Sequence, residues 1–181
     1  MKPPAYSRWL FTYASGSTGS PIHLAAELFK AMAAVNIVRI PYKGGTPALN
    51  ALISGEVQLM FPAVSTVGAY LKSGRLKVLA VASAQPSALL PGLPTIAASG
   101  LPGYESVSMY GMFAPAKTPE AIINRLNQEI VRVLNTPEAK KKLFNAGAEV
   151  IASSPERFAA AIRAEMTTLG KVISDRGIKV E

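Results

Sequence analysis

The sequence predicts an α/β protein with a mainly parallel sheet flanked by helices. Short apolar runs of strand length alternate with amphipathic runs of helix length, an alternation typical of parallel sheets covered by helices. Of the 181 residues, 49% are hydrophobic and 17% are charged, which suits a packed globular chain. No apolar run reaches the ~18 residues that a membrane-spanning helix needs. Composition and periodicity therefore favour a globular α/β fold.

The first half of the chain supplies the predicted sheet and its helices. Strands are predicted where short apolar stretches occur, at 10–15, 37–42, 57–61 and 76–82. Helices are predicted between these strands, at 21–34, 47–54 and 67–72. The first helix should begin at Pro21, because Ser20 supplies a capping oxygen and a proline at the first helical position needs no N–H partner.

The second half is predicted to be rich in helix. Residues 85–104 contain four prolines and three glycines, which continue neither the helical nor the strand period, so this stretch is predicted to be a connector. After the connector, strands are predicted at 105–116 and 148–152, and helices at 118–135, 136–147 and 154–175. Each of these helices is preceded by a hydroxyl residue, a proline and a glutamate, with Thr118, Thr136 and Ser154 as the predicted caps.

The turn between the first predicted strand and helix is rich in hydroxyl groups and glycines. It consists of Ser15, Gly16, Ser17, Thr18, Gly19 and Ser20. Free backbone N–H groups, hydroxyls and the positive end of a helix dipole would converge there, which is an anion-binding arrangement. The turn has neither the Gly-Lys-Ser/Thr of a Walker loop nor the dinucleotide-binding glycine fingerprint. The alternative is a capped turn that binds nothing.

A second turn of similar composition follows the second predicted strand. It contains Tyr42, Lys43, Gly44 and Gly45, and it could form a second anion-facing loop beside the first. The alternative is a tight strand-to-helix turn with an exposed lysine. The chain carries a net charge of +8, and residues 1–100 contain eight Lys or Arg against two Glu. This balance favours an anionic partner.

The sequence contains little that points to catalysis, and no enzymatic activity is expected. The chain has one histidine, His23, and one aspartate, Asp175, so a Ser-His-Asp triad would need both, with Ser15 or Ser17 as nucleophile. His23 should lie in the first helical turn, where the dipole disfavours the protonated imidazole, and a core or capping role is the alternative. No cysteine or histidine cluster is present, so no metal or other cofactor is expected. The lysine run 140–142 is interpreted as a solvated face, and no nucleic-acid partner is expected.

Five stretches resemble, in this order and spacing, the tripartite tricarboxylate transporter substrate-binding proteins, or Bug-type receptors. They are "YASGSTGSPIHLAAELF", "VRIPYKGGTPALNALISGEVQLMF", "GRLKVLAVAS", "LPTIAASGLPGYE" and "GMFAPAKTPEAIINRLNQEIVRVL". The resemblance implies a non-catalytic periplasmic solute-binding protein with two α/β lobes. Their cleft would close on a small carboxylate and deliver it to a membrane permease. Residues 10–105 would form one lobe without its first strand and helix, and 106–181 the segment that completes the other lobe.

The resemblance also suggests site residues by position. The turn from Ser15 to Ser20, with His23 just beyond, resembles the family loop that faces the ligand carboxylate. The turn 42–45 and the strand end at Pro62 and Ala63 resemble neighbouring cleft walls, and Tyr110 resembles an aromatic residue near the cleft. Many members carry an Asp-Asn-like pair where this chain has Pro62 and Ala63, which argues against an amino-acid ligand.

The resemblance begins partway along the family's chain. The glycine-rich loop of the first lobe and the first strands of both lobes precede its start, and no signal peptide is expected in the opening residues. The apolar face of the long helix, with Ile122, Leu126, Ile130 and Val133, would then need another partner. We therefore expect self-association, or collapse into one α/β unit. The remaining alternatives are a small serine hydrolase and an assembly fragment that oligomerises without ligand.

Overall fold

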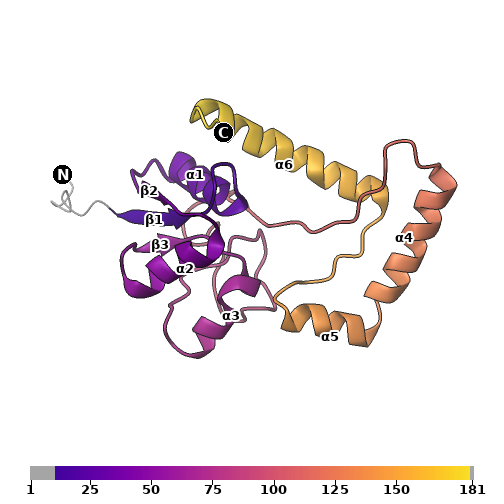
Figure 1. Ribbon diagram of the computed structural model, residues 1–181, viewed down its shortest axis with the longest axis horizontal. Coiled ribbons are helices and arrows are strands. Elements are labelled where there is room, and N and C mark those ends of the chain that lie inside the picture. The colour runs from indigo at the N-terminus through magenta and orange to yellow at the C-terminus, as the bar shows by residue number, and fades with distance from the viewer. Residues whose placement is uncertain (1–10, 180–181) are drawn as a thin grey trace.

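A three-stranded parallel sheet forms the centre of the N-terminal half of the computed structural model, which describes residues 11–179 (Figure 1). Strand β1 (Thr12–Ser15) lies between β2 (Val38–Pro41) and β3 (Leu59–Met60). Because β2 and β3 lie on opposite sides of β1, the strand order reverses at the carboxyl end of β1. In open parallel sheets, such a switch point is where ligands bind.

Two helices cover the two faces of this sheet (Figure 1). Helix α1 (Pro21–Ala33) packs on one face, where Tyr13 is buried in a cluster with Ala26. Helix α2 (Gly45–Ser54) packs on the other face, where Ala14 is buried in a cluster with Ala48 and Val57. Neighbouring residues of β1 thus point to opposite sides of the sheet, as the strand period requires. A third helix, α3 (Val64–Lys72), follows β3.

The connector wraps over the outer side of α1. It contains no helix or paired strand, as predicted, but it is packed rather than loose. Tyr104 is 1% exposed and its hydroxyl donates to the Ala25 carbonyl at 3.0 Å. Tyr104 also clusters with Leu28 of α1 and with Val172. Helix α1 therefore lies between the sheet and an outer layer that includes the connector.

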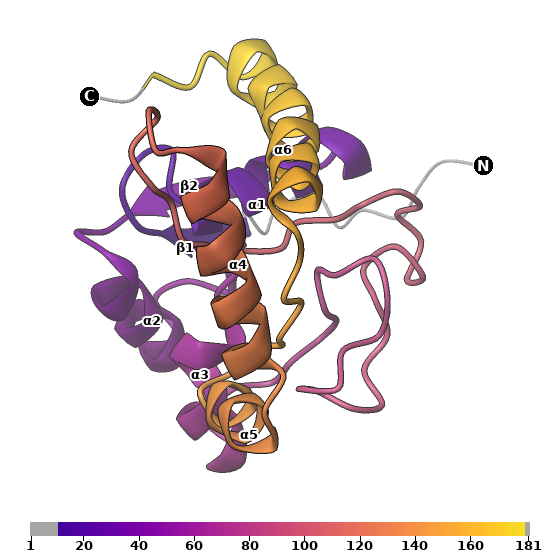
Figure 2. The same ribbon diagram turned by 90° about the vertical axis from the view of Figure 1, so that its right-hand side faces the viewer.

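Three helices follow the connector: α4 (Glu120–Leu134), α5 (Pro137–Asn145) and α6 (Pro155–Asp175). Helix α6 packs against α1, with Val172 in the same buried cluster as Leu28. Helices α4 and α5 lie away from the sheet (Figures 1 and 2). No residue of α4 or α5 is buried. None of the helices within residues 11–179 is both long and apolar enough to cross a membrane.

Three predicted strands are wrong. Residues 76–82, 105–116 and 148–152 form no strand of a sheet in the described part of the chain. Val81 makes a single isolated bridge to Thr95, and Ser106 N donates to the Ala82 carbonyl at 2.9 Å, but neither contact extends into a ladder of paired residues. An apolar run becomes a strand only when another strand satisfies its backbone groups, and these runs lack one. The predicted absence of a signal peptide concerns the opening residues, which lie outside 11–179.

The predicted helix starts are confirmed where a side-chain oxygen caps the helix. Ser20, Thr136 and Ser154 each accept a hydrogen bond from the backbone three residues later. Thr118 is not the cap, because Pro119 occupies the cap position and no side chain caps α4; the Thr118 N–H closes a turn onto the Pro115 carbonyl. The second and third helices begin earlier than the predicted residues 47 and 67, at Gly45 and Val64.

Candidate ligand-binding site

Three strand-to-helix loops meet the carboxyl edge of the sheet. They are the β1–α1 loop (16–20), the β2–α2 loop (42–44) and the β3–α3 loop (61–63), and each leads into a helix N-terminus. The first two loops touch, because a Cβ atom placed on Gly16 would lie 3.6 Å from the backbone of Gly44. In addition, Tyr42 N donates to the Ser15 carbonyl at 2.9 Å. Two of the predicted loops therefore form one continuous surface.

The β1–α1 loop leaves several backbone donors without a partner. Gly19 N donates to His23 Nδ1 at 3.0 Å, and Ser20 N donates to the Ser17 carbonyl at 3.1 Å. Within residues 11–179, no acceptor lies in hydrogen-bond geometry for the N–H groups of Gly16, Ser17 and Thr18. Three consecutive N–H groups next to a helix N-terminus form an arrangement that attracts anions.

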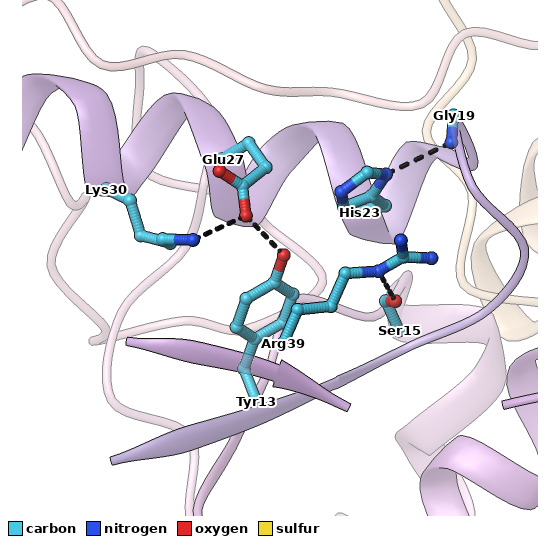
Figure 3. A network of polar contacts seen from close by, with 7 residues as sticks. All are labelled: Tyr13, Ser15, Gly19, His23, Glu27, Lys30 and Arg39. Carbon is cyan, nitrogen blue, oxygen red and sulfur yellow. Dashed lines mark hydrogen bonds and ion pairs between the residues drawn. The ribbon is translucent and has the colours of Figure 1, made fainter. Parts of the chain in front are cut away.

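Arg39 braces this loop from strand β2. Its Nε donates to Ser15 Oγ at 2.7 Å (Figure 3). Its Nη1 donates to Thr18 Oγ1 at 3.2 Å and its Nη2 to the Gly16 carbonyl at 3.1 Å. The register pairs Arg39 with Tyr13, which places both on the α1 side of the sheet. Arginine can only donate, so the Thr18 oxygen is an acceptor here and its hydroxyl hydrogen stays available for another acceptor.

His23 serves as part of the loop structure. It is 4% exposed, and its Nδ1 accepts the Gly19 N–H, so the neutral ring carries its hydrogen on Nε2 (Figure 3). Burial lowers the pKa of His23 below its ordinary value, and the positive charge of Arg39 lowers it further. The capping alternative from the sequence is what the structure shows. In the described chain, no serine hydroxyl or carboxylate hydrogen-bonds to this imidazole, as a catalytic triad would require.

A buried polar cluster lies beside Arg39, between β1 and α1. The Tyr13 hydroxyl and Lys30 Nζ each donate to Glu27 Oε1 at 2.6 Å (Figure 3). Burial alone would raise the pKa of Glu27, but the hydrogen bonds from Lys30 and Tyr13 outweigh it and the pKa lies below its usual value. Burial, together with the Glu27 carboxylate, raises the pKa of Tyr13. Glu27 is therefore ionised and neutralised by Lys30.

The remaining predicted site residues fall into two groups. Lys43 is exposed in the β2–α2 loop, and the half-buried Pro62 and Ala63 form the β3–α3 loop at the same edge. Tyr42 donates its hydroxyl to Glu56 at 2.8 Å. Tyr110, by contrast, is 79% exposed. No hydrogen bond or ring contact in residues 11–179 joins it to these loops.

Sequence reasoning missed Arg39, Tyr13 and Glu27. Arg39 is a single charged residue in the apolar stretch "VRIPY", and a charge at an inward position of a strand is a signal that could have been used. Its acceptors come from another strand and loop, so only the register of β1 against β2 reveals them. Together, the β1–α1 loop presents N–H groups that attract anions, and the Arg39 guanidinium is hydrogen-bonded to that loop.

The chain belongs to the tripartite tricarboxylate transporter family receptors, whose family profile matches residues 8–178. A UPF0065 protein of Pseudomonas knackmussii is 40% identical over 131 residues, which cover 72% of this chain and 78% of that protein. Protein BugT of Bordetella pertussis is 30% identical over 169 residues, covering 93% of this chain and 52% of BugT. The resemblance noted in the sequence is therefore confirmed.

Solved structures agree with the fold. A structure of an R. palustris protein with adipate has a TM-score of 0.80 and 36% identity, covering 93% of this chain and 56% of that one. The periplasmic binding protein BugD has a TM-score of 0.73 and 29% identity, covering 93% and 57%. The periplasmic-binding-protein-like α/β class is thus confirmed. This chain spans about half the length of BugT and of these two structures.

Proposed function

We propose that this chain carries one side of a carboxylate-binding cleft, with the β1–α1 loop as the surface that contacts the ligand. The observation that carries this proposal is the row of N–H groups at Gly16, Ser17 and Thr18, which find no partner in the described part of the chain and lie at the switch point of the sheet. A carboxylate has two oxygens that accept such donors. The family supports this ligand class, since related structures contain adipate and, in MatC of Rhodopseudomonas palustris, malate.

The neighbouring loops would complete this side of the cleft. The β2–α2 loop touches the β1–α1 loop through Gly44 and brings a second helix N-terminus to the same surface. Lys43 is exposed, so it would attract anions over a distance rather than pair with them directly. Pro62 and Ala63 would form an apolar wall. Binding would then rest on N–H groups, hydroxyls and ordered water.

The proposed role in the cell is that of a receptor in the periplasm that passes its ligand to a membrane permease. The support is family membership and the likeness to BugD, which is a periplasmic binding protein. A cleft with one side open to solvent desolvates its ligand incompletely, so we expect weak affinity for this chain alone. The alternative of a serine hydrolase finds no support in the contacts of His23.

A thermal-shift titration tests the carboxylate site directly. Adipate, malate and citrate would be added to the chain, with adipamide as a neutral ligand of the same length as adipate. We expect a dose-dependent rise in Tm for a carboxylate and none for adipamide, because a ligand that binds only the folded state stabilises it.

A variant pair locates the binding. Thr18→Val removes the loop hydroxyl at constant volume and should reduce the shift, while Thr168→Val, at an exposed position of α6, should leave it unchanged. No shift with any carboxylate at millimolar concentration, with the chain folded, would contradict the proposed site.

We also infer that two copies of this chain associate through the exposed apolar side chains of α4 and α5. Ile122, Leu126, Val133 and Phe144 are between 44% and 51% exposed there. A second copy offers the same apolar face, so a symmetric pair would cover both. Sedimentation velocity should show a dimer that Leu126→Glu converts to a monomer. A wild-type chain that stays monomeric at high micromolar concentration would contradict this arrangement.

A further inference from the structure

Arg39 holds a positive charge that no carboxylate of residues 11–179 neutralises. Its three hydrogen bonds all go to neutral oxygens, on Ser15, Gly16 and Thr18. The ion pairs found in residues 11–179 do not include Arg39, whereas the neighbouring Lys30 is paired with Glu27 at 2.6 Å. Partly buried cations are normally paired, so an unpaired guanidinium at this place calls for an anionic partner from outside the chain.

The position of Arg39 relates this charge to the β1–α1 loop. Its guanidinium bonds Gly16 and Thr18 through a carbonyl and a hydroxyl, and the N–H groups of the same two residues have no partner in the described chain. The charge therefore lies directly behind the donors that would meet a ligand. Arg39 is half-buried, so water screens its field less than that of a surface lysine.

We propose that Arg39 determines the charge specificity of this loop, making it select an ionised carboxylate over a neutral amide of the same shape. This inference rests on the proposed carboxylate site and adds the residue that discriminates. Backbone N–H groups alone donate to an amide oxygen as well as to a carboxylate oxygen. A fixed positive charge behind them favours only the anion.

Arg39 acts as a positioning residue as well as a charge. Its three bonds connect the end of β1 to the middle of the loop and leave the Thr18 hydroxyl hydrogen free to donate toward the ligand. Among the described residues, the neighbouring titratable side chains cannot replace its charge. His23 is kept neutral by its lowered pKa, Lys30 is neutralised by Glu27, and Lys43 lies exposed in solvent.

The experiment is isothermal calorimetry with adipate and adipamide on the full chain and three variants. Arg39→Lys keeps the charge but cannot reach three acceptors, Arg39→Gln removes the charge but keeps amide donors, and Arg163→Gln removes the same charge from an exposed position on α6. We expect Arg39→Gln to lose about tenfold in the preference for adipate over adipamide. Arg39→Lys should keep most of that preference, and Arg163→Gln should keep all of it.

The outcomes separate the two proposals. If the wild-type chain binds neither ligand nor any other carboxylate, the proposed site itself is wrong. If it binds adipate and Arg39→Lys and Arg39→Gln lose the preference equally, Arg39 only braces the loop and the specificity inference is overturned. An unchanged preference in Arg39→Gln overturns it as well. Should Arg39→Gln fail to fold, Arg39→Met supplies a neutral variant without unpaired donors, with the same expected loss.

Discussion

Two amphipathic helices of similar length, α1 with 13 residues and α4 with 15, have opposite surroundings in this molecule. Helix α1 is enclosed between the sheet and the layer formed by the connector and α6, and it buries five residues, Leu28 among them. Helix α4 buries none, and Leu126 on its apolar stripe is 48% exposed. The apolar stripe is present in both helices, but only α1 has elements on both sides to cover it.

The difference shows where the stability of this chain resides. An amphipathic stripe stabilises a fold only in proportion to the apolar area that neighbouring elements remove from water. The sheet, α1, α2 and the connector supply that area to one another, so this part of the chain should carry most of the free energy of folding. Helices α4 and α5 bury no residue, so they receive little of this area and should be easier to unfold or rearrange.

The largest effect should come from a matched pair of leucine truncations. Leu28→Ala removes a side chain that is 5% exposed between Tyr104 and Val172, and it should lower the free energy of unfolding by about 2–4 kcal/mol. Leu126→Ala removes a side chain that is half in solvent, and it should cost less than about 1 kcal/mol. Urea unfolding followed by circular dichroism measures both.

The same pair of variants can contradict the contrast between α1 and α4. If both variants lost the same free energy of unfolding, α4 would be covered in solution to the same extent as α1 is in this structure. Sedimentation of the wild-type chain at the same concentration then shows whether a second copy provides that cover, since a dimer makes the apparent stability depend on concentration.

The sequence predicted the elements whose signals are local. Helix starts at Ser20, Thr136 and Ser154 were right because a capping oxygen and a following proline act within one turn. The predicted strands at 76–82, 105–116 and 148–152 were wrong because a strand depends on a partner strand, which local sequence does not specify. The pattern of α4 gave its helix correctly but could not show what covers it.

The candidate site was predictable in part for the same reason. The β1–α1 and β2–α2 loops were identified from glycines and hydroxyls at strand ends, and the structure brings them into contact at Gly16 and Gly44. Arg39 was missed because its role depends on the pairing of β1 with β2, which a single charged residue in a strand does not reveal. The aromatic Tyr110 was predicted near the cleft, and its role there stays a prediction.

Removing a buried ion pair in α1 should cost more stability than removing an exposed ion pair in α5, and we expect this difference to be of intermediate size. Glu27→Gln keeps the size of the side chain and an acceptor oxygen, but it removes the charge that Lys30 and Tyr13 stabilise, and it should cost about 1–3 kcal/mol at pH 7. Glu138→Gln breaks the pair with Lys142, whose side chains are more than 75% exposed, and it should change little.

Glu27 should also make the folding stability depend on pH in a predictable direction. Because its pKa is lowered by folding, its contribution is fully present above its ordinary value of 4.5 and is lost as the pH falls through the lower value in the folded chain. Wild-type protein should therefore lose more stability below pH 4.5 than Glu27→Gln does. If the free energy of unfolding fell equally with pH in both proteins, the Glu27 carboxylate would not be stabilised as its contacts indicate.

The smallest effect, and the one that needs no ligand, is the titration of His23. As the single histidine of the chain, it gives one set of imidazole signals in an NMR titration. Burial and the charge of Arg39 place its pKa below the ordinary value of 6.5, so the folded chain should resist protonation and lose stability as the pH falls below 6.5. Arg39→Gln should raise this pKa, and Arg163→Gln should leave it unchanged. A wild-type value at or above 6.5 would mean that burial and Arg39 do not act on this ring as the structure indicates, and the contrast between an enclosed α1 and an exposed α4 would fail at the site itself.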